Sequence, residues 1–225
     1  MWELSQWIGD ALQLSKFAEL AIIIFGAYQF YKGRKERNEA DAAAAERARI
    51  DSNYQAWQVI NSAQGKGGSG GRIEALGDLL RNGVSLNGIR LDDAWLEEVQ
   101  LPRARMVRSS LRGTNFTRAN LAGANLEGAD LTDADLLAAD LTGANLRGAT
   151  LVGARLSAST LDGADLREVV GWQDVRSMGH ASVVGVRNAP PGFLQLARGM
   201  GAVDAEMKAA AEDGTLEYSQ HFRAI

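Results

Sequence analysis

The chain of 225 residues contains no cysteine, only two histidines and only three prolines. Without cysteine there is no disulfide, no thiolate nucleophile and no cysteine-ligated metal. His180 and His221 are too few for a multi-histidine metal site. The net charge of −4 excludes a protein that binds nucleic acid through bulk positive charge. We therefore expect no catalytic residues, no metal, no cofactor and no nucleic-acid partner.

Glycine, by contrast, is in excess, with 25 residues, and much of that excess belongs to a repeat. From Leu86 to Leu166 a large apolar residue recurs every five positions, seventeen times without a break. A small residue stands two positions before each, and in eleven units it is alanine. Asn or Asp lies between the two in eight units, and Gly follows the large residue by two positions in at least seven.

A period of five residues suits neither regular element. On a helix the large residues would spread over all sides, and on a flat strand they would alternate between the two faces. The chain must instead turn once in five residues and point two of the five inward. Asn and Asp favour the turn because their side chains bond nearby backbone, and Gly accepts unusual dihedral angles.

Residues 84–168 resemble the pentapeptide-repeat family, whose unit reads A-(D/N)-L-x-x, in units such as A-N-L-E-G and A-D-L-T-G. The resemblance implies a mainly β fold, a right-handed quadrilateral parallel β-helix with four pentapeptides in each coil. Side chains fill the axis of such a solenoid and leave no pocket. The resemblance therefore implies a protein that is not an enzyme, with regular faces on which a partner can dock.

Five segments follow from the pattern. We expect an N-terminal hydrophobic membrane helix at 1–31, a charged linker helix at 32–64, a Gly-rich hinge and N-terminal capping helix at 65–83, the β-helix at 84–188 and a C-terminal helical cap and tail at 189–225. Ile50, Tyr54 and Trp57 share one helical face, which we expect to pack on the capping helix. The same stripe leaves self-association of the chain open.

The N-terminal segment predicts contact with lipid. Its apolar core includes Leu20, Ile22, Ile23, Ile24 and Phe25. A basic flank follows, with Lys32, Arg34, Lys35 and Arg37. The positive-inside rule then predicts a single-pass protein of the cell membrane whose repeat region is cytoplasmic. The alternative is an amphipathic helix that lies on the membrane or is buried in a partner.

The outward-facing residues carry whatever specificity the coils have. With four units in a coil, residue n lies beside residue n+20, so we expect Arg112 over Asp92 and Arg118 over Glu98. Leu137 is an apolar side chain in a position expected to face water. The candidate interaction surface is Leu137, Ala138, Ala158 and Thr117. Five arginines cluster near the N-terminal coils and face different sides: Arg103, Arg105, Arg108, Arg112 and Arg118. They face lipid head groups in one interpretation and pair with acidic residues in the other.

The resulting prediction is a membrane-anchored, non-catalytic scaffold. It displays a cytoplasmic β-helix to an unknown protein partner, and a larger membrane assembly that includes the chain as a subunit fits the same features. The alternative is the DNA mimicry by which some soluble members of the family act on type II topoisomerases. That activity needs a strongly acidic rod, whereas residues 84–168 hold twelve Asp and Glu against nine Arg.

Overall fold

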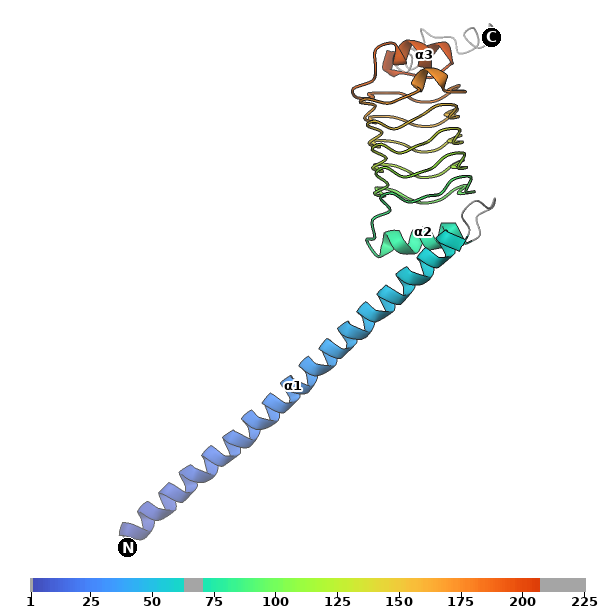
Figure 1. The fold of residues 1–225 in the computed structure, drawn as a ribbon. Coiled ribbons are helices and arrows are strands. Elements are labelled where there is room, and N and C mark those ends of the chain that lie inside the picture. Colours follow the sequence, from blue (N-terminus) through green and yellow to red (C-terminus); the bar gives the residue numbers. More distant parts are fainter. Residues whose placement is uncertain (1, 63–70, 207–225) are drawn as a thin grey trace. The chain divides into compact units, whose positions relative to one another are not determined.

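Figure 1 shows the computed structural model, which describes residues 2–62 and 71–206. Its helices are α1 (Trp2–Ser62), α2 (Arg72–Arg81), the 3₁₀ helix η1 (Trp172–Asp174) and α3 (Phe193–Gly199). The chain divides into two compact units, Met1–Asp51 and Ser52–Ile225. The predicted hinge at 65–70 and the tail from residue 207 lie outside the described residues.

Between α2 and η1 the second unit winds into stacked coils (Figure 1). Parallel bridges join residues twenty positions apart, from Arg90 with Ser110 to Thr150 with Val170. One coil therefore contains four pentapeptides, as the resemblance implies. Each unit contributes one isolated bridge residue instead of a longer strand, so the described coils contain less regular strand than a mainly β class predicts. The chain turns before a second residue of the same face can pair.

The unit around Leu121 shows how the coils are bonded. Leu121 N–H donates to the carbonyl of Asp140 at 2.8 Å, and Gly123 N–H donates to that of Thr142 at 2.8 Å. Within the unit, Ala124 N–H returns to the carbonyl of Leu121 at 2.9 Å and closes the turn. The backbone polar groups are thus satisfied by the turn and by the coils on either side.

Two features of the repeat shape each turn. The residue two positions after the large one has a positive φ in all seventeen units, whether it is Gly, as at Gly143 (65°), or not, as at Arg118 (56°). In all eight units with Asn or Asp, that side chain accepts a hydrogen bond from the N–H two residues later, as Asn120 does from Ala122 at 3.1 Å. Glycine is therefore favoured in this position but not required.

The core lies along the axis of the coils. All seventeen large apolar residues of the repeat are buried, and so are its eleven alanines. Where a hydroxyl replaces alanine it finds a carbonyl, since Ser109 Oγ donates to Met106 at 2.8 Å and Thr114 Oγ1 donates to Leu91 at 2.8 Å. Buried hydroxyls bonded in this way cost little stability.

The last turns of α1 and all of α2 cover the N-terminal end of the core. Leu76 and Leu79 of α2 are fully buried, together with Ala56 and Ile60 of α1. The predicted face of Ile50, Tyr54 and Trp57 was wrong in part, because Ile50 and Tyr54 are exposed and only Trp57 packs against the core. The face that packs is instead the one that carries Ala56, Trp57 and Ile60.

The register changes at the C-terminal end. Here bridged residues lie 22 positions apart, as in Arg155 with Ser177, because η1 adds two residues to the coil. Phe193 at the start of α3 is buried, and its ring meets that of Trp172 edge to face at 6.0 Å between centroids. The core is therefore closed by helices at both ends of this unit (Figure 1).

The first unit consists of α1 as far as Asp51. One continuous helix occupies the region in which the sequence analysis placed a boundary at residue 31. Its side chains from residue 19 to residue 51 are exposed, apart from a half-buried Gly33.

Candidate functional site

The four predicted interaction residues lie on one face of three consecutive coils. Arg118 N–H bonds the carbonyl of Leu137 at 2.8 Å, and Glu98 N–H bonds that of Thr117 at 2.9 Å, so Thr117 and Leu137 stand in one column. Ala138 and Ala158 form the neighbouring column and are exposed, whereas Leu137 and Thr117 are half-buried. The structure brings these residues together as a small, weakly polar patch.

Ion pairs flank this patch. Arg118 contacts Glu97 and also donates from Nε to Glu98 Oε1 at 2.8 Å, which agrees with the prediction from the twenty-residue offset. The hydrogen bond with Glu98 is the main cause of a raised pKa at Arg118. The negative charges of Glu97 and Glu98 raise that pKa further. On the other side, Arg155 Nη1 lies 2.8 Å from Asp135 Oδ2.

The predicted position of Arg112 over Asp92 is confirmed, but the two side chains do not form an ion pair. Arg112 stacks on Asp92 through its backbone N–H at 3.1 Å, but its guanidinium lies 2.8 Å from Asp130 Oδ2 in the coil that follows. Asp92 accepts a hydrogen bond from Ser110 Oγ instead. Burial alone would raise the pKa of Asp130, but hydrogen bonds from Thr132 and Arg112 outweigh it and leave that pKa lowered.

The apolar segment of α1 is exposed around its whole circumference. Leu20, Ile22, Ile23, Ile24 and Phe25 each expose more than half of their surface. Within residues 2–62 and 71–206, no helix combines the length and the apolar character that a membrane crossing needs. The predicted single span is therefore not supported. The uncharged stretch at 20–31 rises only about 18 Å, against about 30 Å for the hydrocarbon core.

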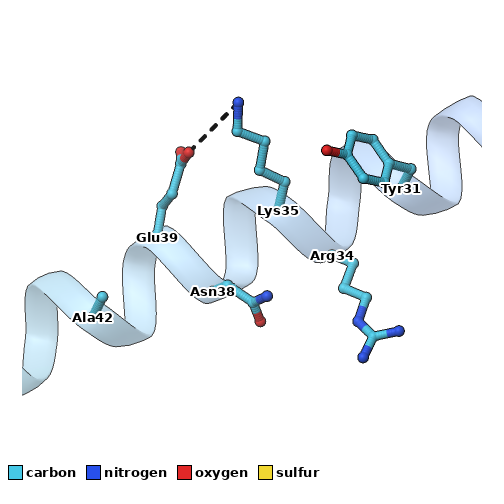
Figure 2. Close-up of a pocket in the computed structure, with 6 residues that line it drawn as sticks. All are labelled: Tyr31, Arg34, Lys35, Asn38, Glu39 and Ala42. Carbon is cyan, nitrogen blue, oxygen red and sulfur yellow. Dashed lines mark ion pairs between the residues drawn. The ribbon is translucent and has the colours of Figure 1, made fainter.

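The predicted basic flank follows this segment on α1. Lys32 lies 3.9 Å from Glu36, Lys35 lies 3.8 Å from Glu39, and Arg37 Nε donates to the carbonyl of Gly33 at 3.2 Å. Figure 2 shows Arg34 on the side of the helix away from the Lys35–Glu39 pair. The positive charge of the flank is thus partly offset by acidic residues one turn further along α1.

Sequence reasoning missed two surface features. Trp95 stands in the bridge position of its unit and exposes 61% of its surface. At the C-terminal end, Trp172, Leu196 and Met200 line a groove of about 540 Å³, with Val170 exposed nearby in sequence. The five-residue spacing places Trp95 outward, one position before Leu96, and the break of the repeat after residue 168 marks the region of the groove. Within the described residues no group of three acidic or histidine side chains could hold a metal.

A family model of pentapeptide repeats matches eight copies, within residues 85–121, 100–136, 109–148 and 139–170. No curated protein matches the chain.

Among solved structures, three pentapeptide repeat proteins from cyanobacteria are similar. HetL of Nostoc sp. strain PCC 7120, described as involved in heterocyst differentiation regulation, is 30% identical over 46% of this chain and 46% of its own, with a TM-score of 0.37. Rfr23 of Cyanothece 51142 is 37% identical over 39% of this chain and 63% of its own, with a TM-score of 0.33. The protein alr5209 of Nostoc PCC 7120 is 28% identical over 63% of this chain and 99% of its own, with a TM-score of 0.35.

The chain thus spans about half of HetL and less than two thirds of Rfr23. The family model covers the same stretch in which the five-residue core spacing and the twenty-residue coils occur. Residues 85–170, the coil region of this chain, therefore match the family model of pentapeptide repeats.

Proposed function

We propose that this chain is a non-catalytic docking scaffold that α1 attaches to the cell membrane, with the coils on the cytoplasmic side. The observation that carries the proposal is the distribution of apolar side chains on α1. The six consecutive residues 20–25 are apolar and exposed, and at 100° per residue they cover every side of the helix. A helix that is apolar all round requires an apolar environment, whereas a partner helix covers one stripe.

The coils support the docking part of the proposal. Their axis is filled by buried Leu and Ala, so the outer faces are what the coils offer to a partner. The patch around Leu137 is bounded by Arg118 and Arg155, which are already engaged with acidic residues. An uncharged centre within a charged rim is the usual layout of a protein interface. DNA mimicry gains no support, because these pairs break up the acidic surface that it needs.

Membrane attachment is tested by sedimentation of cell membranes from cells that produce the full chain. We expect the wild type to sediment with the membranes and the variant Ile22→Ser/Ile23→Ser/Ile24→Ser to remain in the supernatant. The matched control is Ala43→Ser/Ala44→Ser/Ala45→Ser, three adjacent exposed residues of the same helix, which should still sediment. Wild-type chain in the supernatant would overturn the attachment. Protease treatment of intact cells tests the cytoplasmic side, where the coils should be protected.

Docking is tested by detergent pull-down with mass spectrometry, comparing the wild type with Leu137→Glu. A partner recovered with the wild type and lost with this variant is the expected result. Thr142→Glu, on an exposed position of a different face, is the control and should retain the partner. Recovery of no specific protein, or equal recovery with all three chains, would remove the support for docking at this patch.

A further inference from the structure

Three exposed arginines lie within six residues of one coil, and we name them the arginine corner: Arg103, Arg105 and Arg108. Among the described residues, none of the three lies within ion-pair distance of a carboxylate, although six other arginines between 112 and 176 do. Stacking explains the difference, because the positions twenty residues later are Gly123, Asn125 and Gly128.

The glycines of the next coil also hold two of these side chains in place. Arg103 Cγ lies 3.3 Å from the point that a Cβ on Gly123 would occupy, and Arg108 Cγ lies 3.4 Å from the equivalent point on Gly128. Both aliphatic stems therefore pack against bare backbone. A side chain held in this way loses less conformational entropy when its guanidinium binds a ligand.

The surroundings indicate a macromolecular ligand. The coil beneath the corner is solid, with Leu101 and Met106 fully buried, and small molecules bind in concave pockets. The three guanidinium groups are spread over adjoining faces of one coil, so they suit an extended anion that presents several oxygen atoms. Such an anion is an acidic protein segment, an anionic lipid surface or a nucleic acid.

Two observations favour protein. All nine basic residues between 84 and 168 are arginine, and none is lysine. Protein interfaces are enriched in Arg and depleted of Lys, and the guanidinium binds a carboxylate through two parallel hydrogen bonds. A wide lipid or nucleic-acid surface would also lie against the twelve acidic residues of the same stretch, whereas a narrow protein segment can contact the arginines without covering them.

We propose that the arginine corner is the contact site for an Asp- or Glu-rich segment of a partner protein. The proposal rests on the proposed docking role of the coils and names the chemistry of the partner. It does not depend on attachment through α1.

The probe is a fluorescent octaglutamate peptide, with octaglutamine as the uncharged control, titrated into the full chain in detergent and read by anisotropy. We expect octaglutamate to bind and octaglutamine not to bind. The variant Arg103→Gln/Arg105→Gln/Arg108→Gln should weaken binding by about tenfold or more. The matched variant Arg112→Gln/Arg147→Gln/Arg167→Gln removes the same charge from engaged arginines that do not border the Leu137 patch, and its binding should stay within about twofold of the wild type. Circular dichroism melts establish that both variants are folded.

Three results would overturn the inference. The first is a wild type that does not bind octaglutamate. The second is equal weakening of binding in both triple variants, which would mean that binding depends on net charge alone. The third is tighter binding of phosphatidylglycerol vesicles or duplex DNA than of the peptide, with that binding lost when the arginine corner is replaced. Failure of the proposed membrane attachment shows in the sedimentation experiment, and failure of docking at Leu137 shows in the pull-down. Neither of these alters peptide binding, so the failures can be told apart.

Discussion

Asn188 donates a hydrogen bond from Nδ2 to Oδ1 of Asp165 at 3.0 Å and so fastens the chain ahead of α3 to the preceding coil. This bond is the main cause of a lowered pKa at Asp165. The backbone N–H of Arg167 and the charges of Arg167 and Arg187 act in the same direction, and burial acts against them. The folded state therefore favours the ionised carboxylate, which makes this end of the coils sensitive to acid.

We predict that Asn188→Ala reduces the loss of stability in acid. Because the pKa of Asp165 is lower in the folded state, its contribution is present above the unfolded value of about 3.9 and is lost as the pH falls through the folded value. Urea unfolding followed by circular dichroism from neutral pH to below this range measures the slope. Asn120→Ala, which removes a bond to the uncharged Gln100, is the control. An Asn188→Ala slope equal to that of the wild type would contradict the prediction.

Two adjacent positions of one unit should differ strongly in the stability that they lose when the same side chain is introduced. Leu141 is fully buried and Thr142 is exposed. We predict that Leu141→Asn costs more than about 3 kcal/mol, because it removes apolar contacts and buries an amide. Thr142→Asn should change the unfolding free energy by about 0.5 kcal/mol or less. Similar losses in the two variants, measured by urea unfolding, would rule out the inward and outward assignment.

Backbone strain at the positive-φ positions should be measurable both when a substitution adds it and when a substitution removes it. Gly143 has a φ of 65° and open space where a Cβ would stand, so Gly143→Ala should cost about 1 kcal/mol from conformation alone. Ala138 has a φ of 55°, and Ala138→Gly should stabilise the coils. Thermal unfolding of the two variants and the wild type provides the comparison, in which a stabilised Gly143→Ala would refute the argument. Gly153→Ala should cost slightly more than Gly143→Ala, because its Cβ would displace Asp133 Oδ1, which pairs with Arg176.

The end of α1 should contribute to the stability of the coils, although most of this helix does not. Ile60 exposes 1% of its surface and Ile50 exposes 54%. We predict a loss of about 2 to 5 kcal/mol for Ile60→Ala and about 0.5 kcal/mol or less for Ile50→Ala. Equal effects on urea unfolding would show that the last turns of α1 do not form part of the core.

The core could be predicted from sequence because each residue of the unit has one role. The five-residue spacing identified every buried residue from Leu86 to Leu166, and the offset of twenty placed Arg118 beside Glu98. The same offset placed Arg112 over Asp92, but the long side chain of Arg112 reaches Asp130 in the next coil. A repeat specifies the position of a backbone atom better than the direction of a flexible side chain.

The helical parts were harder to predict because no repeat constrains them. Ile50, Tyr54 and Trp57 have a plausible helical spacing, but the face that packs is set by the shape of α2 and the first coil. The chain also forms one helix through residue 31, since a change from apolar to charged residues does not by itself end a helix. The arginine corner could be seen in the sequence only as a charge cluster, and its lack of acidic neighbours became clear once the coils were stacked.

Because one coil contains twenty residues, the length of an insertion or deletion in the repeat determines its effect on the surface. A change of twenty residues in the repeat would lengthen or shorten the stack and leave every later face pointing in its original direction. A change of five would turn all later residues by a quarter of a revolution and separate Thr117 from Leu137. The two extra residues at η1 do neither, because a local loop absorbs them at the point where the repeat ends.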